Sequence, residues 1–135
     1  MLLCFAIMPI SVPPDRLGTY SNQPDHFLHV AEYLFRPAVE AAGYEFRTPA
    51  AQHAEIIQAG IIESLGEADL VLCDISTWNP NVFYEFGIRC ALDKPVAMIK
   101  DNTTERIPFD TAMVNCHTYS AELSVMSVQR GKSQN

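Results

Sequence analysis

The sequence is short of basic residues and contains no apolar segment long enough to cross a membrane. Its 135 residues include 9 Lys and Arg against 16 Asp and Glu, which gives a net charge of −7. Because binding to a nucleic acid backbone needs a basic face, nucleic acid is excluded as the main partner. A small anionic ligand held by backbone amides and one or two Arg is not excluded. The apolar run Met1–Ile10 is too short to span a bilayer and is interrupted by Pro9, so no membrane segment is predicted.

The sequence also lacks the residue patterns of metal sites and of serine or cysteine hydrolases. Its four cysteines are not spaced like zinc ligands, and His26 and His29, three residues apart, have no third ligand nearby. No Gly-rich phosphate loop and no Ser–His–Asp or Cys–His arrangement is evident from the spacing. We therefore expect no metal and no bound cofactor, and reduced thiols in a cytoplasmic protein. The cysteines are Cys4, Cys73, Cys90 and Cys116.

The chain does contain short, continuous apolar runs that alternate with helical patterns. Runs without period-two alternation suit parallel strands that are covered on both faces. The predicted strands are Leu2–Ile10, Tyr44–Thr48, Asp69–Ile75, Pro95–Lys100 and Cys116–Tyr119. The predicted helices are Asp25–Ala42, His53–Leu65 and a segment from Asn79 to about Asp93. This alternation predicts a single α/β domain, with a five-stranded parallel sheet in the order 2-1-3-4-5 and helices on both faces.

Two irregular features interrupt this pattern. Pro37 lies inside the first helical segment, so we expect a kink or break near Tyr33–Arg36. The segment Ser11–Pro24 has no strong periodicity, and a long structureless loop in a small domain is usually functional or mobile. We assign residues 1–120 to the domain and residues 121–135 to a short C-terminal helix or frayed tail.

A ligand site is expected beyond the carboxyl ends of the strands, where the strand order reverses. With the predicted order, this point lies between the first and third strands. The first strand delivers Met8 and Pro9 to it, and the third strand delivers Asp74. Backbone donors after Met8–Pro9 could receive a phosphate, although Pro9 is as well explained as a strand terminator.

The third helix begins abruptly at this point. Asn79 suits the capping position, and Pro80 suits the first helical position because its missing N–H is not needed there. Glu85 then falls in the second turn, where the positive end of the helix favours an ionised carboxylate. Since Asn81 and Glu85 are four residues apart, they share a helix face. We therefore expect Asp74, Asn81 and Glu85 to point toward one pocket.

A plainer interpretation exists for Glu85. It precedes Arg89 by four residues, which is the favoured order for an ion pair on an exposed helix surface. Two observations weigh against this interpretation. The helix is otherwise mostly apolar and has little surface to expose, and its start lies at the predicted switch point.

The neighbouring candidates have alternatives too. Asp74 could bind ribose hydroxyls or cap the turn that follows it. Asn81 could donate to a sugar oxygen or satisfy local backbone groups. Trp78 and Tyr84 could stack on a base or belong to the core.

Several segments in order resemble a known group. FAIMPI, PAVEAAGYEFR, ADLVLCDIS, NPNVFYEFG, DKPV and IPFD resemble a bacterial domain of the nucleoside 2-deoxyribosyltransferase-like and TIR-like group. The resemblance runs from about Leu3 to Tyr119, and NPNVFYEFG followed by KPV is its most specific part. It implies a flavodoxin-like fold and cleavage of an N-glycosidic bond by a glutamate, which corresponds to Glu85.

The resemblance implies NAD as the first candidate substrate and a nucleoside or nucleotide as the second, with a role in antiviral defence or nucleotide signalling. In the transferases, the glutamate attacks C1′ of the sugar and holds it covalently. They carry an aspartate just before the helix, where this chain has Asn79 and Asn81. The alternatives are therefore a nucleoside 2-deoxyribosyltransferase, a nucleotide N-hydrolase, or a non-catalytic nucleotide-binding or self-associating TIR-like module. Such domains often assemble, so a homo-oligomer is expected.

Overall fold

The sheet has the predicted strands and the predicted order. The computed structural model describes residues 1–49, 57–105 and 116–121. Five strands pair in parallel in the order β2-β1-β3-β4-β5. They are β1 (Leu2–Ile7), β2 (Tyr44–Arg47), β3 (Leu70–Asp74), β4 (Val96–Asp101) and β5 (Cys116–Tyr119). This is the α/β, flavodoxin-like topology, and the reversal between β1 and β3 is where the sequence placed a site.

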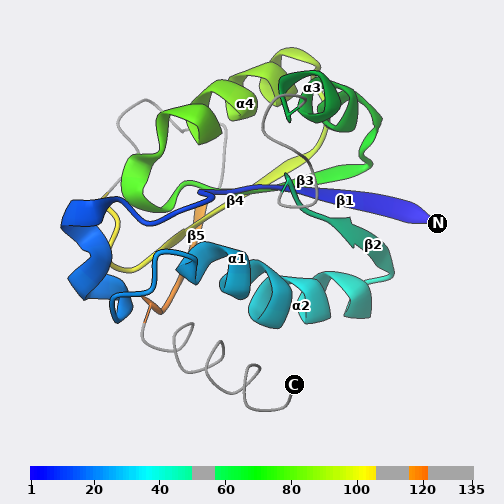
Figure 1. The fold of residues 1–135 in the computed structure, drawn as a ribbon. Helices are drawn as coiled ribbons and strands as arrows, with labels where there is room; N and C mark the ends of the chain where they lie inside the picture. The colour runs from blue at the N-terminus through cyan, green and yellow to red at the C-terminus, as the bar shows by residue number, and fades with distance from the viewer. Residues whose placement is uncertain (50–56, 106–115, 122–135) are drawn as a thin grey trace.

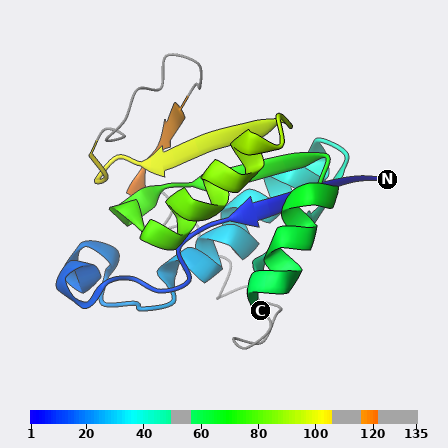
Figure 2. The same cartoon turned by 90° about the horizontal axis from the view of Figure 1, so that it is seen from above.

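Helices cover both faces of the sheet and make a three-layer domain (Figure 1). On one face lie α1 (His26–Val30), the π-helical turn η2 (Ala31–Phe35) and α2 (Arg36–Ala41). On the other face lie α3, described over Ile57–Glu67, and α4 (Pro80–Ala91). Seen from above, α3 and α4 lie over the central strands (Figure 2). Within the described residues, no helix is long and apolar enough to cross a membrane.

Successive residues of β3 enter two different cores. Val71 and Cys73 pack beneath α3 and α4, whereas Leu70 and Leu72 pack with the α1–α2 side. This alternation is the ordinary geometry of a strand, in which neighbouring side chains point to opposite faces. It also fixes the side to which each residue at the end of β3 turns.

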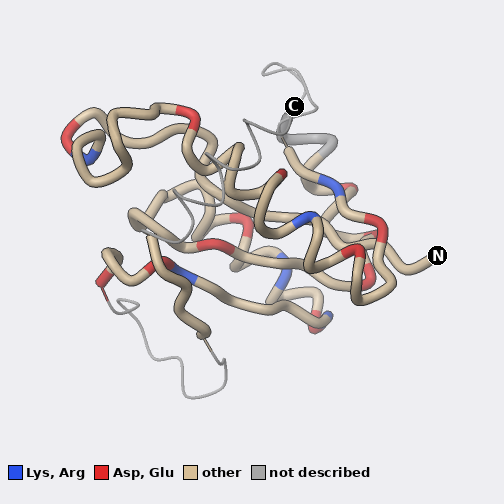
Figure 3. The backbone as a smooth tube through the Cα atoms, turned by 90° about the horizontal axis from the view of Figure 1, so that it is seen from below, with Lys and Arg blue, Asp and Glu red and all other residues tan. Residues whose placement is uncertain are grey.

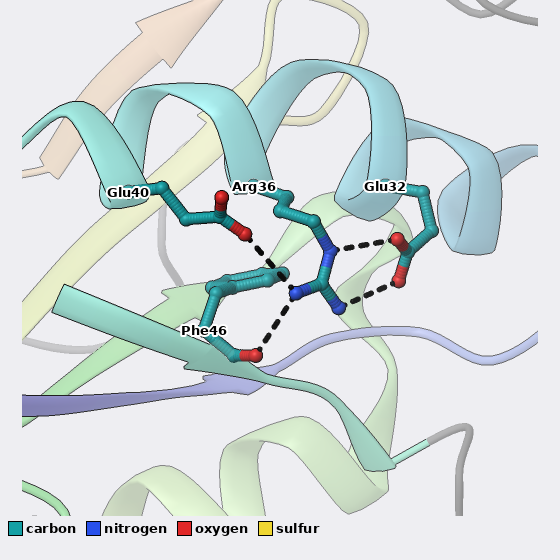
Figure 4. A network of polar contacts seen from close by, with 4 residues as sticks. All are labelled: Glu32, Arg36, Glu40 and Phe46. Carbon is teal, nitrogen blue, oxygen red and sulfur yellow. Dashed lines mark hydrogen bonds and ion pairs between the residues drawn. The ribbon is translucent and has the colours of Figure 1, made fainter.

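Pro37 distorts the first helical segment where the sequence predicted a kink. Its missing N–H cannot bond to the Tyr33 carbonyl, and the chain forms the wider π-helical turn Ala31–Phe35 just before it. Arg36 ties this region to β2 (Figure 4). Its guanidinium contacts Glu32 at 2.7 and 3.0 Å, Glu40 at 3.3 Å and the Phe46 carbonyl at 3.1 Å.

The prediction of a structureless loop is wrong for part of Ser11–Pro24. Residues Pro14–Tyr20 form the 3-10 helix η1, and Tyr20 is completely buried. Its ring packs in a small core with Val12 and Phe27, and its hydroxyl donates to Asp101 Oδ2 at 2.6 Å. The buried Tyr20 ring and its hydrogen bond to Asp101 therefore help to order a segment that has no periodicity of its own.

The assignment of residues 121–135 to a C-terminal helix or tail lies almost wholly outside the described residues. Ala121 alone is described, and it is buried against Val12, Tyr20 and Phe27.

Candidate active site

The start of α4 has the capping geometry that the sequence predicts. The Asn79 side chain accepts hydrogen bonds from the backbone N–H groups of Asn81 at 2.9 Å and Val82 at 3.3 Å. Pro80 occupies the first turn, where no intrahelical donor is required. The helix therefore begins at the carboxyl end of β3 and runs back over the sheet, with Val82 and Phe86 facing the core.

Glu85 lies on α4 with a half-buried side chain. Burial raises the pKa of its carboxyl group to about 7. Burial also raises the pKa of the Cys73 thiol on β3, and the carboxylates of Asp74 and Glu85 raise it further. In the described part of the chain, Glu85 makes no hydrogen bond or ion pair that would compensate its desolvation.

Arg89 does not pair with Glu85, so the surface ion-pair interpretation is wrong. The Arg89 side chain is fully buried and bonds to backbone carbonyls of two other segments. Its Nη1 donates to the Leu65 carbonyl at 2.8 Å, and its Nε and Nη2 donate to the Pro95 carbonyl at 3.1 and 2.9 Å. Arg89 therefore satisfies a carbonyl in the last turn of α3 and locks α4 to the start of β4.

Asp74 is buried in a network of hydrogen bonds within the protein. Its Oδ1 accepts from the Ser76 N–H at 3.0 Å and the Ser76 hydroxyl at 2.6 Å, and its Oδ2 accepts from the Tyr119 hydroxyl at 2.8 Å. Only 1% of Asp74 is exposed. Burial raises its pKa to about 6, against the lowering effect of these bonds, and the charge of Asp101 raises it as well.

A second buried carboxylate, Asp101, continues this network at the end of β4. The Ser76 hydroxyl accepts from the Asp101 N–H at 2.9 Å, so one side chain joins the ends of β3 and β4. Asp101 also accepts the Tyr20 hydroxyl of η1 and the hydroxyls of Thr103 and Thr104, both at 2.8 Å. The polar groups at this edge of the sheet are therefore tied to one another.

The expectation that Asp74 and Glu85 point toward one pocket stays a prediction. By the alternation of β3, Asp74 turns with Leu72 to the α1–α2 side and reaches Tyr119. Helix α4, which carries Glu85, covers the opposite face, where Cys73 packs.

The other predicted site residues follow β1 or lie between the end of β3 and the first turns of α4. Met8 and Pro9 are buried where β1 ends. Asn81 is exposed in the first turn of α4, and Tyr84 is 64% exposed on its outer surface. Trp78 is partly exposed, and its Nε1 donates to the Glu105 carbonyl at 3.2 Å. Asn81 and Glu85 share a face of α4, as their spacing predicts.

Glu85 does not line either of the following two cavities, which are formed by described residues. One is an apolar groove of about 410 Å³ between α2 and strands β3 to β5. The other is a polar cavity of about 180 Å³ lined by Arg16, Thr77, Trp78, Thr103, Thr104 and Glu105.

Sequence reasoning missed the polar groups contributed by η1 and by the end of β4. Asp101 follows an apolar run at the carboxyl edge, and that position was a usable signal. Arg16, Thr103 and Tyr20 carry no such signal, because they meet only through tertiary packing. Figure 3 shows the described Lys and Arg residues spread over separate elements rather than gathered on one face.

The fold resembles that of a known enzyme. A 2-deoxyribosyltransferase from Leishmania mexicana superposes with a TM-score of 0.51 at 16% sequence identity. The match covers 74% of this chain and 65% of that enzyme, so this chain spans less than two thirds of its length. At this identity, the likeness shows a shared fold. No protein family model matches the sequence, and no curated protein matches it.

Proposed function

We propose that this protein cleaves the N-glycosidic bond of a nucleoside or nucleotide, with Glu85 as the nucleophile. The observation that carries the proposal is the state of Glu85: a half-buried carboxyl group, desolvated and without a compensating partner in the described chain. A carboxylate in this state at the ligand-binding edge of a parallel sheet is a candidate for chemistry. Because Arg89 bonds to backbone carbonyls, a surface ion pair with Arg89 does not explain why Glu85 is present at this position.

The proposed reaction has two steps. The Glu85 carboxylate attacks C1′ of the sugar while the bond from C1′ to the base nitrogen breaks, and the electron pair leaves with the base, which takes up a proton. Positive charge develops at C1′ as the base departs, and the carboxylate stabilises it. In the second step, water or the nitrogen of a second base attacks C1′ and releases Glu85. Water yields the free sugar, and a second base yields a new nucleoside.

The choice of a nucleoside or nucleotide over NAD rests on the structural neighbour, whose name specifies 2-deoxyribosyl transfer. NAD cleavage and a role in defence or signalling have no support beyond the sequence resemblance. The oxygen of Asn79 is engaged in capping α4. In this proposal Asn81, exposed one turn before Glu85, therefore supplies the amide that contacts the sugar.

The test is release of a free base by the purified full chain. Deoxynucleosides, deoxynucleoside 5′-monophosphates and NAD are incubated separately, over a series of protein concentrations, and the base is detected by chromatography with mass detection. Glu85→Gln should abolish release, because an amide neither attacks C1′ nor carries the charge. Glu63→Gln, at an exposed position on α3, is the matched control and should retain full activity. Full activity in Glu85→Gln would overturn the assignment.

The pH dependence separates a nucleophile from a proton donor. With a pKa of about 7, Glu85 is ionised above neutrality. If it attacks C1′, kcat/KM rises with pH through about 7 and then levels. A rate that falls over the same range would make Glu85 a general acid, and the covalent step would have to be abandoned.

A further inference from the structure

The polar cavity at the ends of β3 and β4 is not lined by Glu85. It occupies about 180 Å³ between η1, the turn after β3 and the turn after β4. Its walls carry one cation, one acid, three hydroxyl groups and an indole. The carboxyl edge of a parallel sheet is where small ligands bind in such folds. The question is which chemical group this set of side chains fits.

Arg16 supplies the positive charge. Its Nη2 donates to the Thr103 hydroxyl at 3.2 Å, and its guanidinium lies 5.9 Å from the centre of the Tyr20 ring. These two contacts hold the side chain beside the cavity. No carboxylate within the described ranges forms an ion pair with it. Since a guanidinium has five N–H donors, most of them remain available to an anion.

The hydroxyls of Thr103 and Thr104 cannot serve as donors to a ligand. Each gives its hydrogen to Asp101 Oδ1 at 2.8 Å. Thr103 accepts from Arg16, and Thr104 accepts from the Thr77 N–H at 3.0 Å. These two residues therefore orient Arg16 and the turn after β3, and the donors left for a ligand are Arg16 and Thr77.

Thr77 provides an independent indication of a ligand. Its Oγ1 is buried, and no hydrogen-bond partner for it lies in the described part of the chain. A buried hydroxyl without a partner is costly and rare, and it calls for a polar group to complete it. Rotation about the Cα–Cβ bond moves the hydroxyl to another staggered position, from which it can meet a ligand in the cavity that Thr77 lines. Thr77 and Trp78 also have φ values of 63° and 53°, in the left-handed region that a β-branched residue strongly disfavours.

We propose that this cavity binds a phosphate group, held by the Arg16 guanidinium and the Thr77 hydroxyl. Arg16 has no ion pair and the Thr77 hydroxyl has no hydrogen bond within the described residues, and both line one cavity, which is a donor set that suits phosphate oxygens. The phosphate comes from a phosphorylated sugar, such as the 5′-phosphate of a nucleotide, or from free phosphate. Glu105, exposed at the rim, opposes the anion and limits its affinity. The site stands on these contacts alone and does not require that Glu85 cleave any bond.

The test measures binding without turnover. The full chain is titrated by calorimetry with 2-deoxyribose 5-phosphate, with 2-deoxyribose and with inorganic phosphate at fixed ionic strength. 2-Deoxyribose 5-phosphate carries no base, so failure of the proposed glycosidase activity leaves the result untouched. The sugar phosphate should bind, and unphosphorylated 2-deoxyribose should not. Inorganic phosphate binding as tightly as the sugar phosphate would support the site and identify free phosphate as its ligand.

Three variants locate the binding. Arg16→Gln should weaken binding of the sugar phosphate by about tenfold or more, because it removes a charged hydrogen bond. Thr77→Val keeps the shape and the β-branch, so it should weaken binding several-fold while the melting temperature stays constant or rises. Arg47→Gln makes the same charge change on β2 and should leave binding unaltered. Absence of binding at millimolar concentration, or equal binding by the Arg16 and Thr77 variants, would overturn the proposal.

Discussion

Replacing Glu85 by Gln should stabilise the protein at neutral and alkaline pH and change little near pH 4.5. The pKa of this carboxyl group is about 7 in the folded protein, against a usual value of 4.5. Between these values the unfolded chain releases the proton and the folded chain keeps it, so the free energy of unfolding falls as pH rises. Above pH 7 both states are ionised, and the loss is complete. Gln carries no titrating group and escapes this loss.

The size of the effect follows from the shift. The full difference in pKa corresponds to about 3 kcal/mol, and the partial exposure of Glu85 reduces this to about 1–2 kcal/mol. For a domain of this size, that is a few degrees in melting temperature. Urea unfolding of both proteins at several values between pH 4.5 and 8 measures it. Asp74 and His26 titrate in both proteins, so their contributions cancel in the difference. If the difference in free energy of unfolding between the two proteins stays constant over this pH range, the folded state does not desolvate Glu85.

Three further substitutions test other parts of the structure. Arg89→Met should lower the free energy of unfolding by about 3–4 kcal/mol, because it leaves the buried Leu65 and Pro95 carbonyls without their hydrogen-bond donor. Arg89→Lys should recover little of this stability, because Lys lacks the planar guanidinium that bonds to both carbonyls. A loss below about 1 kcal/mol in urea unfolding would argue against these bonds. Asp74→Asn should lower the free energy of unfolding by about 2–3 kcal/mol and leave the KM for the nucleoside unchanged, because Asp74 bonds to Ser76 and Tyr119 within the protein. A raised KM with normal stability would instead indicate that Asp74 contacts the sugar. His26→Leu should raise the melting temperature more at pH 5 than at pH 8. Burial lowers the pKa of His26 to about 4, so the folded protein loses stability as pH falls from 6.5 toward 4, and Leu removes that loss; an equal gain at both pH values would contradict this account.

The sequence was sufficient to predict the sheet because the strands that build it are buried on both faces. Such strands appear as continuous apolar runs, and the helices between them fix parallel pairing and the order β2-β1-β3-β4-β5. The start of α4 was equally predictable, since Asn79 and Pro80 act through local backbone geometry. Local rules and global topology agree at these places, and no tertiary information is needed.

The same property hid the direction of Asp74. A continuous apolar run does not reveal which residues face which layer, so the sequence could place Asp74 at the carboxyl edge but not on a side. The structure supplies the side through Cys73, which packs under α4, and Leu72, which packs toward α2. Asp74 points to the same side as Leu72 and accepts a hydrogen bond from Tyr119 on β5. Tyr119 is 45 residues away in the sequence, so no local pattern predicts this partner.

The stability that the protein loses by burying the Glu85 carboxyl group indicates a function for this residue. An uncharged residue at this position would avoid the desolvation that raises the carboxyl pKa to about 7, and Arg89, the nearest candidate for compensation along the helix, is committed to backbone carbonyls. Proteins readily acquire stabilising substitutions at sites without a role, so a destabilising acid in a capped helix at the carboxyl edge of the sheet calls for a functional reason. Glu85 titrates near neutral pH. At the same edge of the sheet, Arg16 has no ion pair and the Thr77 hydroxyl no hydrogen bond among the described residues, and a charged or polar ligand explains these groups better than folding does.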